Sequence, residues 1–252
     1  MSELDGSVGE LDGRVAIVTG SSSGIGEATA RKLSELGCRV VVNSSSSVEA
    51  GTAVAESLPS EALYVQADIS DQVQGQALIA RTIEQFGRLD VLVNNAGWTR
   101  QVKHADLDAL TDEILRRTFE VNVFGTWWLT RAAMPYLRQS PDPNVVMITS
   151  VAGLRPAGSS IAYAMSKAAL NHLTALLAKS CGPVRVNAVA PGLVATPLSA
   201  NMPDQHAAVA AAVPLHRSAH PEDCAEAVIG LLRNAYVTGH VLVVDGGSSL
   251  VW

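Results

Sequence analysis

The sequence predicts an α/β protein with one doubly wound parallel sheet of about seven strands and helices on both faces. Short Val-rich runs alternate along the chain with longer amphipathic stretches, which is the pattern of βαβ units. Hydrophobic residues make up 48% of the 252 residues, enough to bury a sheet on both faces. No linker, low-complexity run or internal repeat divides the chain. We therefore expect a single domain.

The expected strands are runs of β-branched and aliphatic residues, which favour extended backbone. In chain order they are 14–19 (RVAIVT), 39–43 (RVVVN), 62–66 (ALYVQ), 89–94 (LDVLVN), 144–149 (NVVMIT), 184–189 (VRVNAV) and 240–244 (HVLVV). The expected helices fill the gaps, where apolar residues recur at helical spacing. They cover residues 25–36, 47–57, 71–86, 112–138, 161–180 and 221–234. The acidic, polar residues 1–10 are expected to form a flexible tail, so the domain spans 11–252.

Composition excludes several function classes. A net charge of −6 and a pI near 5.5 argue against binding to nucleic acid or to an anionic membrane surface. No apolar run reaches the roughly 18 residues needed to span a bilayer, and the polar start is no signal peptide. Cys38, Cys181 and Cys224 are isolated and odd in number, which favours a reducing compartment, the cytoplasm. No cysteine has metal-ligand spacing with another Cys or a His, so we expect no metal site.

A glycine-rich loop, "TGSSSGIG" at 19–26, joins the first expected strand to the first expected helix. The unpaired N–H groups of a first helical turn, together with the helix dipole, favour an anion such as a pyrophosphate. The G-x3-G-x-G spacing departs from the G-x-G-x-x-G fingerprint, so this loop alone could be an ordinary tight turn. Polar or glycine-rich segments follow other strands too, at the edge where parallel sheets bind ligands.

From about Leu11 to the C-terminus, the sequence resembles the short-chain dehydrogenase/reductase family. "TGSSSGIG" matches the family's cofactor loop, and "NNAG" at 94–97 matches the motif after its fourth strand. "YAMSK" at 163–167 matches Y-x3-K, and "PGLVAT" matches the segment over the nicotinamide. The resemblance implies a single-domain Rossmann-type oxidoreductase that is a dimer or tetramer.

Four residues are the candidate catalytic group: Asn122, Ser150, Tyr163 and Lys167. Tyr163 and Lys167 are four apart and share a helix face. A nearby ammonium and an oxidised nicotinamide would lower the phenol pKa from its usual value near 10. Tyr163 would then be the general acid in carbonyl reduction and the general base in alcohol oxidation, with Ser150 hydrogen-bonding the substrate oxygen. Asn122, as the resemblance implies, would hold a water that links Lys167 to a proton relay.

The resemblance also assigns residues to the dinucleotide. The cofactor loop supplies Gly20, Ser22, Ser23, Gly24, Ile25 and Gly26 for the pyrophosphate. Asp68 and Ile69 would lie beside the adenine, and Asn95, Ala96 and Gly97 beside the nicotinamide ribose, which Lys167 would also contact, with Tyr163 close by. The segment over the nicotinamide amide and phosphates supplies Pro191, Gly192, Val194 and Thr196. Thr196 could equally be the N-cap of a following helix.

The end of the second strand favours NADP(H) over NAD(H). NAD-dependent enzymes place an acid there to bind the ribose 2′-hydroxyl, but no carboxylate appears in this sequence before Glu49. Ser44, Ser45 and Ser46 could instead donate hydrogen bonds to a 2′-phosphate. Against this, Ser23 stands where many NADP-dependent relatives carry a basic residue.

The Ala- and Val-rich segment 197–214 is expected to form a helical substrate lid, since lids exclude water from such reactions. Trp98 and Leu154 could add apolar walls or belong to the core. Arg100, Lys103 and Arg155 are the nearest candidates to bind a substrate carboxylate, and each could instead be solvated.

These features favour an NADP(H)-dependent oxidoreductase acting on the carbonyl or secondary alcohol of a small or medium, mainly apolar molecule. A 3-oxoacyl-[acyl-carrier-protein] reductase is the alternative, although "SPDPN" and "SCGP" lack the positive charge expected of a carrier-binding surface. A non-catalytic dinucleotide-binding regulator is an alternative of another class. The segment "FGTWWLTRAAMPYL" carries more apolar surface than one buried stripe needs, which favours a homotetramer or homodimer.

Overall fold

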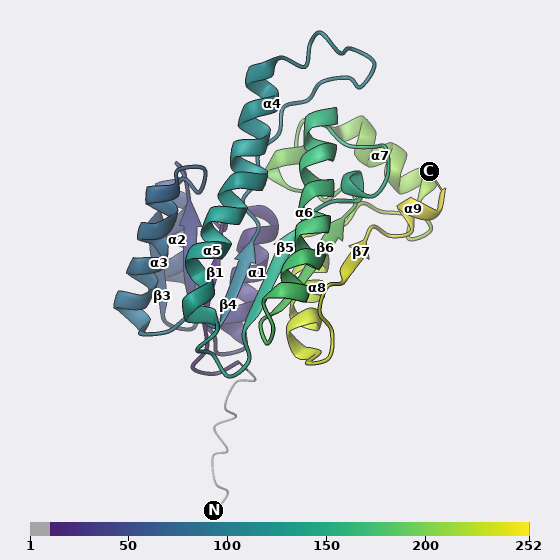
Figure 1. Ribbon diagram of the computed structural model, residues 1–252. Helices are drawn as coiled ribbons and strands as arrows, with labels where there is room; N and C mark the ends of the chain where they lie inside the picture. Colours follow the sequence, from purple (N-terminus) through teal and green to yellow (C-terminus); the bar gives the residue numbers. More distant parts are fainter. Residues whose placement is uncertain (1–10, 252) are drawn as a thin grey trace, which may run out of the picture.

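The computed structural model describes residues 11–251, and the expected tail at 1–10 lies outside them. Seven strands form one sheet in the order β3-β2-β1-β4-β5-β6-β7, and every pairing is parallel (Figure 1). The strands are β1 (Val15–Val18), β2 (Arg39–Ser44), β3 (Ala62–Gln66), β4 (Val91–Asn94), β5 (Asn144–Ile148), β6 (Arg185–Pro191) and β7 (Val241–Val244). The doubly wound parallel sheet expected from the sequence is confirmed.

Helices cover both faces of this sheet. They are α1 (Gly24–Glu35), α2 (Val48–Ser57), α3 (Gln72–Phe86), α4 (Asp112–Phe119), α5 (Thr126–Leu137), α6 (Ile161–Ser180), α7 (Pro203–Ala212), α8 (Pro221–Arg233) and α9 (Ser248–Val251). Val15 and Ile17 of β1 join a core with α3, α5 and α6, whereas Ala16 and Val18 join a second core with α1, α2 and α8. Successive strand residues face opposite sides, so a strand buried on both faces is apolar throughout.

The helix expected over 112–138 is confirmed as one unbroken helical stretch from Asp112 to Leu137, although its middle is not α-helical. A π-helical turn, η1 (Glu120–Gly125), separates α4 from α5. At its end Gly125 lies close to the loop after β3: a Cβ there would be 2.7 Å from the carbonyl oxygen of Ile69. Such turns insert an extra residue and occur often at functional sites. This one contains Asn122.

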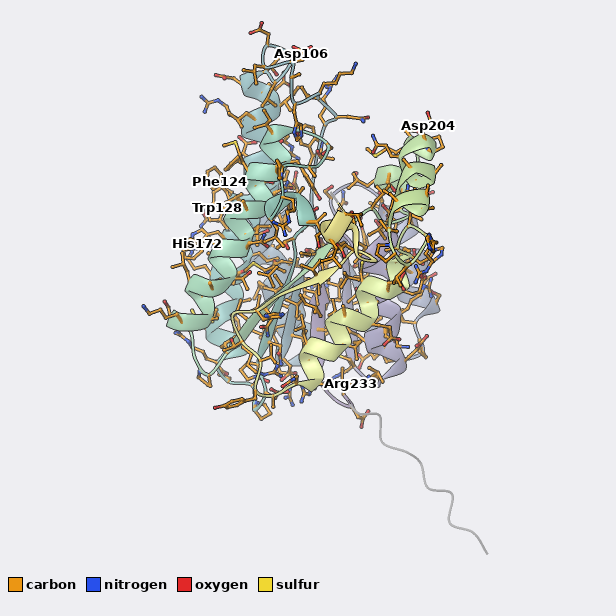
Figure 2. The ribbon with its side chains drawn as sticks, turned by 90° about the vertical axis from the view of Figure 1, so that its right-hand side faces the viewer. Asp106, Phe124, Trp128, His172, Asp204 and Arg233 are labelled. Atoms are coloured by element: carbon orange, nitrogen blue, oxygen red, sulfur yellow. The ribbon has the colours of Figure 1, made fainter. Side chains whose placement is uncertain are left out.

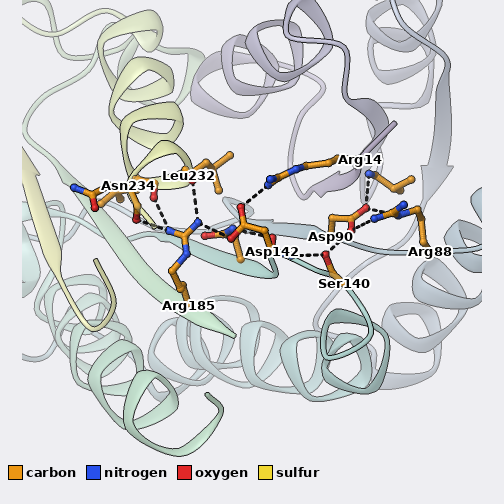
Figure 3. Close-up of polar contacts among 11 residues, drawn as sticks. Arg14, Arg88, Asp90, Ser140, Asp142, Arg185, Leu232 and Asn234 are labelled. Carbon is orange, nitrogen blue, oxygen red and sulfur yellow. Dashed lines mark hydrogen bonds and ion pairs between the residues drawn. The ribbon is translucent and has the colours of Figure 1, made fainter. Parts of the chain in front are cut away.

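A buried carboxylate joins several segments at the edge of the sheet opposite the strands' carboxyl ends (Figure 3). The side chain of Asp90 is 1% exposed and pairs with Arg88 at 2.7 Å. It also accepts hydrogen bonds from the backbone N–H of Val15 (2.9 Å) and from the hydroxyl of Ser140. Burial alone would raise the pKa of Asp90, but these partners hold it below its usual value.

A second carboxylate, that of Asp142, extends this network toward the carboxyl end of α8. Asp142 pairs with Arg14 at 2.8 Å and with Arg185 at 3.0 Å. Arg185 also donates to the backbone carbonyls of Leu231, Leu232 and Asn234 at the carboxyl end of α8 (Figure 3). Its guanidinium therefore stabilises the orphan carbonyls of that helix end.

We expect Asp90→Asn to lower the free energy of unfolding by about 2–3 kcal/mol at neutral pH, because it removes charge-assisted hydrogen bonds from a buried site. The folded-state pKa of Asp90 is lowered, so its stabilisation is complete above the unfolded pKa near 3.9 and is lost as pH falls through the folded value. Urea unfolding of both proteins should show the difference shrinking in acid. The exposed Asp112→Asn is the control, and an equal loss there would contradict the assignment.

Candidate active site

A cavity of about 900 Å³ lies at the carboxyl ends of the strands, within the usual size range of ligand sites. The loops after β1 to β6 line it. In Figure 2 the loop that carries Asp106 and the helix α7 that carries Asp204 stand on two sides of the upper end of the molecule. From these two sides Gln101 and Gln205 line the cavity.

Most residues predicted for the site line this one cavity. They are Gly20, Ser22, Ser23, Gly24, Ile25, Ser44, Ser45, Asp68, Ile69, Asn95, Ala96, Gly97, Ser150, Tyr163, Lys167, Pro191, Gly192, Val194 and Thr196. Three predicted residues are not part of the lining: Gly26, Ser46 and Asn122. Ser47 lines the cavity in place of Ser46.

The cofactor loop presents free donors to the cavity. Ser23 is the N-cap of α1 but makes no side-chain cap hydrogen bond, and the first amide bonded within the helix is that of Glu27, to the Ser23 carbonyl (3.2 Å). The preceding N–H groups of α1 therefore have no partner in the helix, and two of the residues that carry them, Gly24 and Ile25, line the cavity, an arrangement that fits a pyrophosphate.

Gly26 shapes this loop from behind. A Cβ there would collide with the Gly20 carbonyl and with the side-chain amide of Asn95. That amide donates to the carbonyls of Thr19 (2.8 Å) and Gly20 (3.0 Å). Only glycine at position 26 lets α1 pack this closely against the turn, so it acts on the loop rather than on the cavity surface.

At the end of β2, Ser44 and Ser45 differ in exposure. The Ser44 side chain is buried and its hydroxyl shares a hydrogen bond with Tyr64 (2.8 Å), whereas Ser45 is exposed. Within residues 11–251, Asp68 is the one acidic side chain of the cavity lining. The end of β2 therefore presents hydroxyl groups and no carboxylate.

Asp68 is paired with a residue that sequence reasoning missed. Arg117 of α4 lines the cavity and donates to the Asp68 carboxylate (3.1 Å) and to Ser70 (2.8 Å). Burial alone would raise the pKa of Asp68, but its hydrogen bonds with Ser70 and Arg117 hold it below the usual value. Nothing in the sequence signals this pair, because its partners are 49 residues apart.

Ser150, Tyr163 and Lys167 converge at the other end of the cavity. The Ser150 hydroxyl lies close enough to the Tyr163 phenol to lower the pKa of that phenol. The Lys167 ammonium lies 5.6 Å from the centre of the Tyr163 ring and donates to the Ile148 carbonyl (2.8 Å). Ser150 follows the end of β5, and Tyr163 and Lys167 lie on one face of α6, as their spacing of four residues predicts.

Burial dominates the ionisation of this group. Burial raises the pKa of the Tyr163 phenol, whereas Ser150 has the smaller, opposite effect and lowers it. Burial also lowers the pKa of Lys167 to about 8. The expectation that a nearby ammonium lowers the phenol pKa is not confirmed, because Lys167 is not among the groups that shift the pKa of Tyr163. The expected lowering then rests on the charge of an oxidised nicotinamide. In the protein alone, the direction is the opposite, because desolvation opposes the phenolate.

Asn122 lies just beneath this end of the cavity and is fully buried. Its side chain accepts from the N–H of Trp98 (2.7 Å) and donates to the Trp98 carbonyl and to Ser166 (both 3.0 Å). A Cβ on Gly97 would lie 3.5 Å from the Asn122 oxygen and 3.6 Å from the Lys167 nitrogen. Asn122 therefore fixes the backbone of the "NNAG" loop beside Lys167.

The expected lid segment is helical: η3 (Pro197–Ser199) and α7 lie over the cavity. His206 of α7 is hydrogen-bonded to Ser218 (2.8 Å) and Ser199 (3.1 Å), which ties the segment to its neighbours. Thr196 is the N-cap residue of η3 and also lines the cavity. Trp98 lines the cavity, but Leu154 does not and is 44% exposed, so the expectation that it forms a wall or belongs to the core was wrong.

Known proteins share this fold and these sequence features. The family model described as enoyl-(acyl carrier protein) reductase matches residues 20–249. A protein of Streptomyces violaceoruber, named for ketoacyl reductase 2 of the granaticin polyketide synthase, is 54% identical over 94% of this chain and 96% of its own. Cis-4-hydroxycyclohexanecarboxylate dehydrogenase of Sinomonas cyclohexanicum is 38% identical over 94% of this chain and 97% of its own.

A solved structure of another reductase has the same fold as this chain. The 3-ketoacyl-(acyl-carrier-protein) reductase of Brucella melitensis, complexed with NADH, superimposes with a TM-score of 0.89 and 31% identity. The match covers 95% of this chain and all of that one.

Proposed function

This chain belongs to the short-chain dehydrogenase/reductase family of oxidoreductases, and from that premise we propose that it transfers a hydride between NADP(H) and the carbonyl or secondary-alcohol carbon of a small or medium, mainly apolar substrate. One observation carries the proposal. Ser150, Tyr163 and Lys167 converge at one end of a cavity whose other end presents the free N–H groups of α1.

The chemistry needs a hydride and a proton. A bound reduced nicotinamide supplies the hydride to the carbonyl carbon. Tyr163 donates its phenolic proton to the carbonyl oxygen, which becomes the alcohol, and Ser150 donates a hydrogen bond to the same oxygen. Because burial raises the pKa of the phenol, Tyr163 holds its proton at neutral pH.

Lys167 and Asn122 act behind this pair. We assign two roles to Lys167: it binds the nicotinamide ribose, and it returns a proton to Tyr163. Asn122 holds the loop beside Lys167 and the water through which the proton reaches Lys167. The position of both around Gly97 supports this assignment.

The preference for NADP(H) rests on the end of β2. Two serines line the cavity there without a carboxylate, so a 2′-phosphate meets hydroxyl donors and no like charge. We also place the enzyme in the cytoplasm, since its three cysteines are buried and unpaired. Of the helices in 11–251, none is both long and apolar enough to cross a bilayer.

Reduction of a 3-oxoacyl group on a carrier protein is the second candidate. It is favoured by the names of a 54% identical relative and of the Brucella structure. The dehydrogenase of Sinomonas supports the first candidate, because its name specifies a cyclic secondary alcohol. The test is NADPH consumption, followed by absorbance, with cyclic ketones and 3-oxoacyl thioesters. Failure with every carbonyl in both classes would contradict the proposed function.

We further propose a homodimer or homotetramer. Phe124 of η1, Trp127 of α5 and two residues of α6, Met165 and Leu176, are 39–49% exposed, and Phe124 packs on Trp128 with ring centres 6.0 Å apart (Figure 2). Apolar surface of this kind on neighbouring elements is typical of a subunit interface. Light scattering should give two or four times the chain mass of 26.3 kDa. A monomer at micromolar concentration would contradict this.

A further inference from the structure

The charged side chains that line the reaction cavity are few, and one of them has no partner. Lys167 is buried, and Arg117 is paired with Asp68 at 3.1 Å. Arg155 is an exposed residue that lines the same cavity, and among the residues from 11 to 251 it has neither an ion-pair partner nor a side-chain hydrogen bond. The one acidic side chain of this lining, Asp68, is paired with Arg117, so the guanidinium donors of Arg155 are free for a ligand.

Arg155 lies at the substrate end of the cavity. Its loop follows Ser150 and passes beside the catalytic phenol, since a Cβ on Gly158 would lie 3.4 Å from the Tyr163 ring. The same loop is fixed to the one after β4, where the N–H of Val102 donates to the Ser159 carbonyl (2.8 Å). The cationic group is therefore carried on a segment in contact with the proton donor, away from the pyrophosphate end.

A second cavity, of about 420 Å³, adjoins this end of the first. Four residues line both cavities: Gln101, Ala157, Gly158 and Ser159. The second cavity adds Lys103 and His104 to its lining, and no acidic side chain within the described range takes part. The Nε2 atom of His104 is buried there without a hydrogen-bond partner among residues 11–251. The space beside the phenol therefore continues into the second cavity, and Arg155 and Lys103 are cationic residues of the two linings.

We propose that the substrate carries an anionic group beside its apolar body and that Arg155 binds this group. The inference rests on the proposed function, whose substrate it narrows. A guanidinium fork matches the paired oxygens of a carboxylate or a phosphate. Two sources supply this chemistry: a carboxylate on the ketone itself, or the phosphate of a pantetheine arm that runs through the second cavity past Lys103.

The carboxylate arm of the test uses 4-oxocyclohexanecarboxylate and its methyl ester, which differ in charge and keep the same ketone. We expect wild-type kcat/KM to favour the acid by about tenfold, a difference of about 1.4 kcal/mol. Arg155→Gln should bring the ratio close to one, and Arg155→Lys should keep most of it. The control Arg138→Gln, an exposed arginine outside the lining of both cavities, should leave the ratio unchanged.

The phosphate arm uses acetoacetyl-CoA and acetoacetyl-N-acetylcysteamine, which share the reacting group. If the anion is the phosphate of the arm, the CoA ester is preferred about tenfold, and both Arg155→Gln and Lys103→Gln remove the preference. If the anion is a carboxylate on the ketone, the preference appears in the first pair and Lys103→Gln leaves it intact. A preference in neither pair, or one that survives Arg155→Gln, overturns the inference.

Failure of the inference is distinguishable from failure of the proposed function. NADPH-dependent turnover of the neutral methyl ester supports the function whatever Arg155 does. Binding supplies a readout without turnover: cyclohexanecarboxylate, titrated calorimetrically into the protein loaded with NADPH, should bind the wild type and Tyr163→Phe but not Arg155→Gln. Equal binding to the wild type and Arg155→Gln overturns the inference. No binding to the wild type at a concentration that saturates the reaction overturns the carboxylate source, and the inference then stands only if the CoA ester is preferred and Arg155→Gln removes that preference.

Discussion

Replacing Tyr163 by Phe is expected to lower kcat by about 10²–10⁴-fold, the usual contribution of a positioned general acid or base. The change removes one hydroxyl from a buried ring, so the fold and NADPH binding should be retained. The loss should appear in kcat and kcat/KM together, because the proton is transferred in the transition state. Stopped-flow absorbance of NADPH with a saturating ketone measures it.

The pH profile provides a second readout for the same residue. In the reverse direction Tyr163 must be a phenolate, so alcohol oxidation should rise with pH through a single ionisation. In the complex with oxidised cofactor, this ionisation should lie below the usual phenol value near 10, because the positive nicotinamide offsets the burial that raises the pKa in the protein alone.

Tyr136→Phe is the matched control for this variant. Tyr136 is half-buried on α5 and does not line the cavity, so removal of its hydroxyl should leave turnover near the wild-type value. Near-normal turnover in Tyr163→Phe with intact NADPH binding would overturn the acid–base assignment and the mechanism with it.

Ser44→Asp is expected to reverse the preference between the two dinucleotides. The wild type should bind NADPH at least several-fold more tightly than NADH. At an effective dielectric of about 20, unit charges about 4 Å apart repel by about 4 kcal/mol, so after solvent screening we expect affinity for NADPH to fall about a hundredfold. A carboxylate at this position also accepts a hydrogen bond from the ribose 2′-hydroxyl, so NADH binding should strengthen. Calorimetric titration of both cofactors measures the reversal.

Two controls separate charge from position in this experiment. Ser46→Asp adds the same charge two residues further on, outside the cavity lining, and should change the preference little. Tyr64→Phe removes the hydrogen bond to Ser44 without adding charge. Tighter or equal binding of NADH by the wild type would contradict the proposed cofactor preference.

The strands and most helices could be predicted because their signal is local. Runs such as "RVAIVT" and "RVVVN" are apolar on both faces of the sheet, so burial and sequence pattern coincide residue by residue. The helix expected over 112–138 forms, but its pattern did not predict the π-helical turn η1, where Gly125 lies against the distant Ile69. The spacing of apolar residues within α4 and α5 carries no information about the loop after β3, which Gly125 contacts.

The candidate site divides in the same way. The sequence by itself determined the glycine-rich turn into α1 and the shared helix face of Tyr163 and Lys167, because short spacings on a turn or a helix fix which groups lie together. Ser150 was assigned through the family resemblance. Only the tertiary structure decided that Arg117 pairs with Asp68, that Ser44 bonds to Tyr64, and that Arg155 faces the cavity unpaired. It also decided that burial raises the phenol pKa of Tyr163. These properties depend on desolvation and on charges brought together from distant parts of the chain, and both arise only when the chain is folded.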